Sequence, residues 1–322
     1  MESKKVNLKG IIQVFKESAK GFMDDNVMVL CGSLSYATIF SLAPLMVVVI
    51  SIISFIYGAD AVQGNIYGSL EEMMGAEAAL QIQNLVKSAT LSGKNTWAAI
   101  IGFGTLIFGA STIFAQIQSS LNTIWGIKPK PKSGLLKLLR NRLLSFSLVL
   151  SIGFLLIVSL SLNTVLSYVG NYFEQYYQNG FKTIFMIIDL LVSFIILSVL
   201  FGYIFKVLPD AKIKLRDVAI GGILTAFLFM IGKSLIAFYI GFSNFDSTFG
   251  ASAAIIIILV WIYYSSLILY FGAEFTKAWA VKFGYKIYPD KYAVTTKNIE
   301  IEIEGEPVMT LNKEVQSVTE QK

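Results

Sequence analysis

The chain has 322 residues, of which 55% are hydrophobic and only 15% are charged, with a formal net charge of +5. Soluble globular domains carry about a quarter of charged residues, so this composition excludes an ordinary soluble fold. The chain has no histidine and one cysteine, Cys31, which excludes Ser-His-Asp and Cys-His catalysis, imidazole metal sites and an intrachain disulfide.

Residues 8–23 are predicted to form an amphipathic helix, because apolar residues recur at helical spacing while Lys9, Lys16 and Lys20 line another face. Such a helix is suited to lie in the membrane interface against anionic headgroups. A cytoplasmic helix packed on the inner end of a helix bundle fits the same pattern equally well. Both alternatives make residues 1–26 a cytoplasmic segment.

Six apolar stretches are each long enough to cross the hydrocarbon core, which takes about 20 helical residues. They leave an extracytoplasmic segment at 58–96 and a polar tail at 284–322, which we expect to be largely flexible. The sequence thus predicts an all-α integral membrane protein with a six-helix domain at 27–283. The predicted helices cover about residues 27–57, 97–120, 143–168, 181–207, 218–241 and 251–281.

Pro44 interrupts the first of these helices. Its ring removes one backbone hydrogen bond, which favours a kink. Upstream hydroxyls such as that of Ser41 can satisfy the freed carbonyls. Such kinks often only serve packing, and a functional hinge is the alternative.

The basic residues lie almost entirely on one side of this topology. Of the 26 Lys and Arg residues, 22 lie before residue 27, in the second and fourth connections, or from residue 277 onward. Cytoplasmic segments carry such an excess, so both termini are predicted to be cytoplasmic. The basic run KPKPK at 128–132 lies in one of these connections and lacks aromatic interleaving, so we expect no nucleic-acid binding.

Lys233 is predicted to lie deep within the fifth helix. It is about 25 Å from the cytoplasmic end at the helical rise, and Asp189 lies about 10 Å in from the outer end of the preceding antiparallel helix. A lone lysine at that depth is costly and marks a functional or paired site by default. Either an Asp189–Lys233 ion pair or an anionic ligand would remove the cost, and Asn163 could join the cluster. A static pair that only fixes helix register is equally compatible.

A second polar cluster is predicted at the cytoplasmic end. Carboxylates in such positions are more often solvated or paired with local lysines, here Lys277, than functional. The members of this cluster are Asp24, Asp25, Gln116, Arg216, Asp217 and Glu274.

Aromatic residues with polar tips occur in the last two predicted helices. Tyr239 could belong to an interfacial aromatic belt. Trp261, Tyr263 and Tyr264 fall deeper and are expected to line helix contacts or a cavity.

Three stretches together resemble the YihY/BrkB family of bacterial inner-membrane proteins. They are DDNVMVLCGSLSYATIFSLAPL, PDAKIKLRDVAIGGILTAFLFMIGKSLIAFYI and STFGASAAIIIILVWIYYSSLILYFGAEFTKAWA. The resemblance covers roughly residues 10–283 and implies a six-helix protein of the bacterial plasma membrane. Hinge or packing roles are expected at Tyr36, Ser41, Pro44, Gly232 and Gly250, and the matched positions also include Pro209, Arg216, Asp217, Lys233, Tyr239, Trp261, Tyr264, Gly272 and Glu274.

Some members of that family have carried a ribonuclease label, which this sequence does not support because it lacks histidine and any metal-ligand set. We expect no enzyme activity, no cofactor and no metal. The leading hypothesis is an ATP-independent transporter or lipid-handling protein for an anionic substrate, either a small ion or a lipid headgroup, admitted near Lys233. The alternatives are a non-transporting envelope scaffold and, last, an intramembrane enzyme using Asp189 or Glu274. The expected partners are anionic membrane lipids, and a homo-oligomer is compatible with the small-residue patterns.

Overall fold

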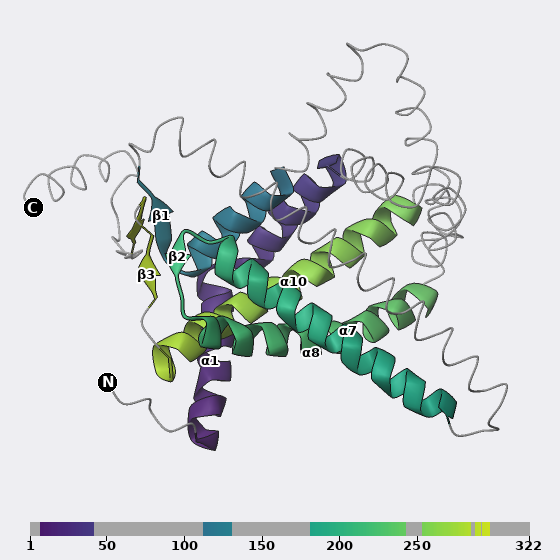
Figure 1. Cartoon of the computed structure of the whole chain (residues 1–322). Helices are drawn as coiled ribbons and strands as arrows, with labels where there is room; N and C mark the ends of the chain where they lie inside the picture. Colours follow the sequence, from purple (N-terminus) through teal and green to yellow (C-terminus); the bar gives the residue numbers. More distant parts are fainter. Residues whose placement is uncertain are drawn as a thin grey trace, which may run out of the picture.

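The computed structural model describes residues 7–41, 112–130, 181–242, 253–284, 287–290 and 292–296. These parts are mostly helical, and Figure 1 shows α7, α8 and α10 running between the strand-bearing end and the opposite side of the molecule. The helices are α1 (Leu8–Asp24), a helix over Val27–Ser41, a helix over 112–124, α7 (Phe181–Val207), α8 (Leu215–Phe242) and α10 (Ala253–Lys282). The strands are β1 (Ile127–Pro129), β2 (Ala211–Lys212), β3 (Tyr288–Pro289) and β4 (Ala293–Thr295).

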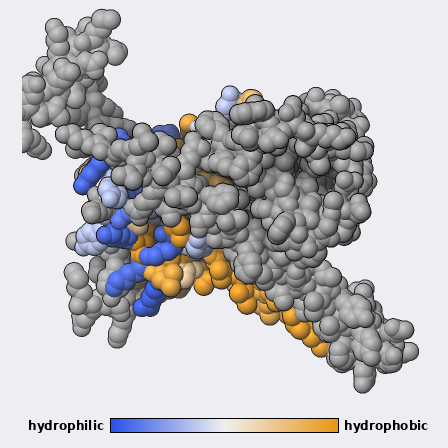
Figure 2. Space-filling view, turned by 45° about the horizontal axis from the view of Figure 1, so that its top comes forward, coloured by the Kyte–Doolittle hydropathy of each residue, from blue (hydrophilic) through white to orange (hydrophobic). Residues whose placement is uncertain are grey.

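Three of the described helices are long and apolar enough to span a membrane, namely Ile187–Val207, Leu215–Ile236 and Ile256–Lys282. They correspond to the last three helices predicted from the sequence. An orange apolar band along the long helices contrasts with the blue polar end of the molecule in Figure 2. The predicted helix at 143–168, the segment 58–96 and Pro44 lie outside the described residues.

Small residues let the long helices approach closely. On α8, Gly221 packs against Thr276 of α10, and Thr225 of α8 packs in turn against Gly272 of α10. Each threonine hydroxyl donates a 2.7 Å hydrogen bond to the glycine carbonyl four residues earlier in its own helix, so its polar group is satisfied inside the apolar contact. Close backbone approach of this kind is the usual basis of helix association in membranes.

The contact between α7 and α8 has the same basis. A Cβ on Gly222 would lie 2.6 Å from the carbonyl oxygen of Ser198, so only glycine fits there. Further along, the ring of Phe229 contacts Phe201 of α7 and Trp261 of α10, at centroid distances of 5.6 and 6.4 Å. Trp261 therefore lines a helix contact, as predicted.

Two small antiparallel sheets close the strand-bearing end, which the all-α prediction did not include. Strand β4 pairs with β1, and β3 pairs with β2, so residues 287–296 join the two connections that follow the helices 112–124 and α7. The backbone N–H of Asp290 also donates to the carbonyl of Asp210 at 2.8 Å. This part of the expected flexible tail is therefore ordered, because its backbone pairs with segments far away in the sequence. The rest of the tail lies outside the described residues.

Polar side chains tie the same end together. The Asn122 amide donates to the Asp210 carboxylate at 3.1 Å, and its oxygen accepts from the Asp210 backbone N–H at 2.9 Å. The indole N–H of Trp125 donates to the carbonyl of Ala273 at 3.1 Å. These hydrogen bonds connect the C-terminal end of the helix 112–124 with the connection after α7 and with α10.

Helix α1 packs on the last turns of α10, as the second interpretation of its sequence predicted. Its N-cap is Asn7, whose side chain accepts from the Gly10 backbone N–H at 2.7 Å. Phe15 contacts Phe275 at a ring distance of 5.1 Å, and Gly10 lies against Phe283. Asn26, at φ 50°, then turns the chain into the helix Val27–Ser41.

Candidate functional site

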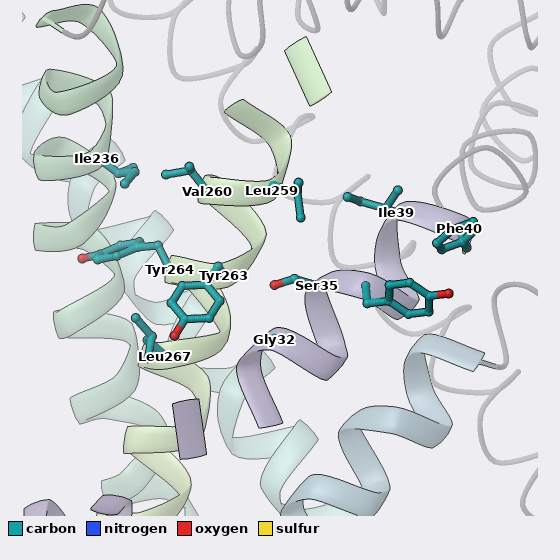
Figure 3. Close-up of a pocket in the computed structure, with 11 residues that line it drawn as sticks. Gly32, Ser35, Ile39, Phe40, Ile236, Leu259, Val260, Tyr263, Tyr264 and Leu267 are labelled. Atoms are coloured by element: carbon teal, nitrogen blue, oxygen red, sulfur yellow. The ribbon is translucent and has the colours of Figure 1, made fainter. Parts of the chain in front are cut away.

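A cavity of about 600 Å³ lies between the helix Val27–Ser41, α10 and α8. Figure 3 shows its lining, in which Ser35 of the helix Val27–Ser41 points toward Tyr263 of α10, while Tyr264 extends toward α8. The lining is apolar apart from four hydroxyl groups, those of Ser35, Tyr36, Tyr263 and Tyr264. The other lining residues are Gly32, Ile39, Phe40, Ile236, Leu259, Val260 and Leu267.

The width of this cavity depends on small residues in the helix Val27–Ser41. A Cβ on Gly32 would meet nothing within 4 Å, so this position opens directly into the empty space. The Ser35 hydroxyl donates to the Cys31 carbonyl at 2.9 Å and therefore turns back onto its own helix. Tyr36 and Phe40 contact each other at a ring distance of 4.8 Å and are largely exposed.

The opposite wall is fixed by a glycine of α8. A Cβ on Gly232 would overlap the ring and hydroxyl of Tyr264, so this glycine lets the tyrosine lie against the α8 backbone. Gly232 was predicted to have a packing role, and this contact provides one. The cavity is thus bordered by residues of three helices that are far apart in the sequence.

A charged cluster lies at the junction of α1 and α10. The Lys277 ammonium lies 3.0 Å from Asp25 and 3.5 Å from Glu274. Glu274 is 1% exposed, and its Oε1 has no hydrogen-bond partner among the described residues. A Cβ on Gly21 would lie 2.5 Å from Glu274 Oε2, so α1 covers the carboxylate directly. Glu274 is therefore paired with Lys277 as expected, but it is buried rather than solvated.

Lys233 and Asp189 do not form the expected ion pair among the described residues. The contact between Gly222 and Ser198 sets an antiparallel register that brings positions 189 and 233 to the same level of α7 and α8. Lys233 is exposed on α8, whereas Asp189 is half-buried and has other interactions. The predicted similarity in depth thus agrees with the register.

The remaining predicted residues are dispersed. At the polar end Asp217 is 2% exposed and lies against Gly284, Gln116 is half-buried, and Asp24 and Arg216 are exposed. Ser41 is buried and Tyr239 is exposed. Asn163, Pro44 and Gly250 lie outside the described residues.

Sequence reasoning predicted Tyr263 and Tyr264 at helix contacts or at a cavity, and it did not place Gly32, Ser35 and Leu259 there. The sequence pattern that could have indicated Gly32 and Ser35 is the spacing of small residues beside Tyr36. Helical spacing places Gly32, Ser35 and Tyr36 on adjoining parts of one helix surface. Sequence reasoning also missed the bridging role of Asn122, because a polar residue at a helix end is most often solvated.

Comparison with known proteins gives one consistent result. The model of the family described as virulence factor BrkB matches residues 18–292. A UPF0761 membrane protein of Vibrio campbellii is 31% identical over 289 residues, covering 86% of each chain. A UPF0761 membrane protein of Psychromonas ingrahamii is 30% identical over 286 residues, covering 86% of this chain and 89% of the relative. No solved structure matches the chain.

Proposed function

This chain is a multi-pass membrane protein of the virulence factor BrkB family, and we propose that it moves an anionic lipid across the bacterial plasma membrane without ATP hydrolysis. In this proposal six helices span the membrane and both termini are cytoplasmic. The one-sided distribution of Lys and Arg supports that orientation. So does the pairing of residues 287–296 with two basic connections, because these segments must then share one side of the membrane.

The observation that carries the proposal is the apolar cavity between the helix Val27–Ser41 and α10. Its volume of about 600 Å³ is in the range of ligand sites, which are about 300–1,000 Å³. A small ion would need charged or dipolar ligands in place of its hydration shell, whereas the described lining offers only hydroxyls. An acyl chain needs no such ligands, so the cavity favours a lipid over a small ion.

Lys233 supplies the cationic group that an anionic headgroup requires. It follows Gly232, whose contact with Tyr264 borders the cavity, and its side chain is exposed on α8. An isolated ammonium group at membrane depth is costly, and a phosphate oxygen lowers that cost by pairing with it. We therefore assign Lys233 to the headgroup and the cavity to the acyl chain. The proposal involves no chemical reaction, cofactor or metal.

The test is lipid translocation by the purified chain in liposomes, with fluorescent phosphatidylglycerol as the anionic probe and fluorescent phosphatidylcholine as the zwitterionic one. We expect the protein to translocate phosphatidylglycerol in preference to phosphatidylcholine. The Lys233→Met variant should lose that preference at least about tenfold, since it removes a charge-assisted contact. The Lys233→Arg variant should retain it.

Three results would contradict the proposal. Unchanged headgroup preference in Lys233→Met would remove Lys233 from the site. Movement of chloride or phosphate ions without lipid movement would favour a transporter of small anions. If neither lipid nor ions moved, the non-transporting envelope scaffold would be the better account.

A further inference from the structure

Helix α1 presents three distinct faces, of which one is buried against the rest of the described protein. The contact face consists of Gly10, Val14, Ser18 and Gly21, spaced by four, four and three residues. The small side chains of this face let α1 lie close to α10. Figure 1 shows α1 lying crosswise at the end of the bundle rather than along α8.

The second face is apolar and mostly uncovered, with Phe15 at its edge in contact with Phe275. Leu8, Ile12 and Met23 are 74%, 50% and 66% exposed, and Phe15 is exposed as well. These residues recur at spacings of four, three and eight, so they form one stripe along the helix. We define them as the α1 stripe. A stripe of large apolar residues left in water would be unfavourable.

The third face is basic and borders the α1 stripe. Lys9, Lys16 and Lys20 are all exposed, and none of them takes part in the charged cluster around Glu274. An apolar stripe beside a lysine face is typical of helices that lie in the headgroup region of an anionic bilayer. Protein partners do not require this charge pattern, whereas anionic headgroups do.

We propose that the α1 stripe is a membrane-surface anchor, which inserts Leu8, Ile12, Phe15 and Met23 among the acyl chains and binds anionic headgroups through Lys9, Lys16 and Lys20. Chain continuity supports a lipid occupant, because the apolar helix Val27–Ser41 begins three residues after α1 ends and α1 cannot leave the bilayer surface. The two interpretations of the sequence are compatible in this proposal, because α1 uses different faces for α10 and for lipid. This anchor does not depend on lipid movement through the cavity.

The depth of the stripe can be measured in the full-length protein. In a Cys31→Ala background, an environment-sensitive fluorophore is attached at Ile12→Cys on the α1 stripe or at Glu17→Cys, an exposed polar position outside the stripe. The protein is reconstituted in vesicles of phosphatidylcholine with or without phosphatidylglycerol. We expect spin-labelled lipid to quench the label at position 12 and aqueous iodide to quench the label at position 17. Equal iodide quenching at both positions in phosphatidylglycerol vesicles would overturn the proposal.

The charge requirement has its own matched pair of variants. Lys9→Gln/Lys16→Gln should reduce lipid quenching at position 12 in phosphatidylglycerol vesicles at low salt, by about fivefold per lysine. Lys128→Gln/Lys212→Gln removes two exposed lysines elsewhere at the same end and should have no effect. An equal loss in both variants would remove the headgroup contact from α1. Protection at position 12 that rises with protein density and needs no phosphatidylglycerol would assign the stripe to a second copy of the chain.

Discussion

Gly221 of α8 lies directly against the side chain of Thr276 of α10. One turn away the roles are exchanged, and Gly272 of α10 lies against the side chain of Thr225 of α8. This reciprocal contact sets the distance between two of the apolar helices. It also aligns α8 with α10 so that Gly232 meets Tyr264 beside the cavity. The packing of two glycines is therefore coupled to the shape of the proposed site.

Replacing Gly221 by alanine should destabilise the protein. The added Cβ would overlap a β-branched side chain that has little rotamer freedom, and overpacking of this kind costs about 1–3 kcal/mol. Gly32→Ala is the matched control, because a Cβ there meets nothing within 4 Å. Thermal unfolding in detergent, followed by size-exclusion chromatography, should show a lower midpoint for Gly221→Ala only. Equal midpoints would mean that α8 and α10 do not approach as closely as described.

Replacing Lys277 should lower the free energy of unfolding more than the position of this residue near a helix end suggests. Lys277→Met removes the cation that contacts both Asp25 and the buried Glu274 carboxyl group, and we expect a loss of about 2–3 kcal/mol, at the lower end because the lysine side chain is 34% exposed. The control is Lys212→Met, whose partner Asp290 lies 3.7 Å away and whose side chain is 67% exposed; it should lose less than about 1 kcal/mol.

A double variant separates the unpaired charge from other effects. Adding Glu274→Gln to Lys277→Met should recover part of the lost stability, because a neutral amide is less costly to bury than an unpaired carboxylate. Additive losses in the double variant would show that the charge of Glu274 is not what Lys277 compensates.

The segment at 287–296 should protect the connections that it pairs with from proteolysis. Truncation after Gly284 removes β3 and β4, so the backbones of β1 and β2 lose their partners. We expect faster trypsin cleavage after Lys212, measured by mass spectrometry of the fragments. Truncation after Thr296 keeps both strands and should leave the cleavage rates unchanged. Identical rates for the two truncations would contradict the pairing.

The long helices could be predicted because hydrophobicity is a local property of the chain. The prediction of 181–207 matches α7 residue for residue, and 218–241 lies within α8. The rotation of these helices could not be predicted in the same way. Beyond Asp217, Lys233 is the only charged residue of α8, so no polar face indicates which side is exposed.

The polar contacts could not be predicted because their partners are distant in the sequence. Asp25 and Lys277 stand near opposite ends of the chain, and nothing local to Glu274 indicates that Gly21 will cover it. The strands β3 and β4 were missed for the same reason, since a two- or three-residue strand forms only when its partner is presented to it. The cavity itself was foreseen only through Tyr263 and Tyr264.

The central claim, that the cavity accommodates a lipid chain, is tested most directly by filling it. Gly32→Leu extends a large side chain from a position where an added Cβ meets none of the described residues within 4 Å, and Ser33→Leu adds the same side chain one position later, outside the lining. Both variants should reconstitute equally well, and phosphatidylglycerol translocation in liposomes is then compared with that of the unmodified chain. The account predicts a loss of at least about tenfold for Gly32→Leu and none for Ser33→Leu, since blocking a fitted site by a few side-chain atoms costs more than about 1.4 kcal/mol. Undiminished translocation by folded Gly32→Leu would contradict it.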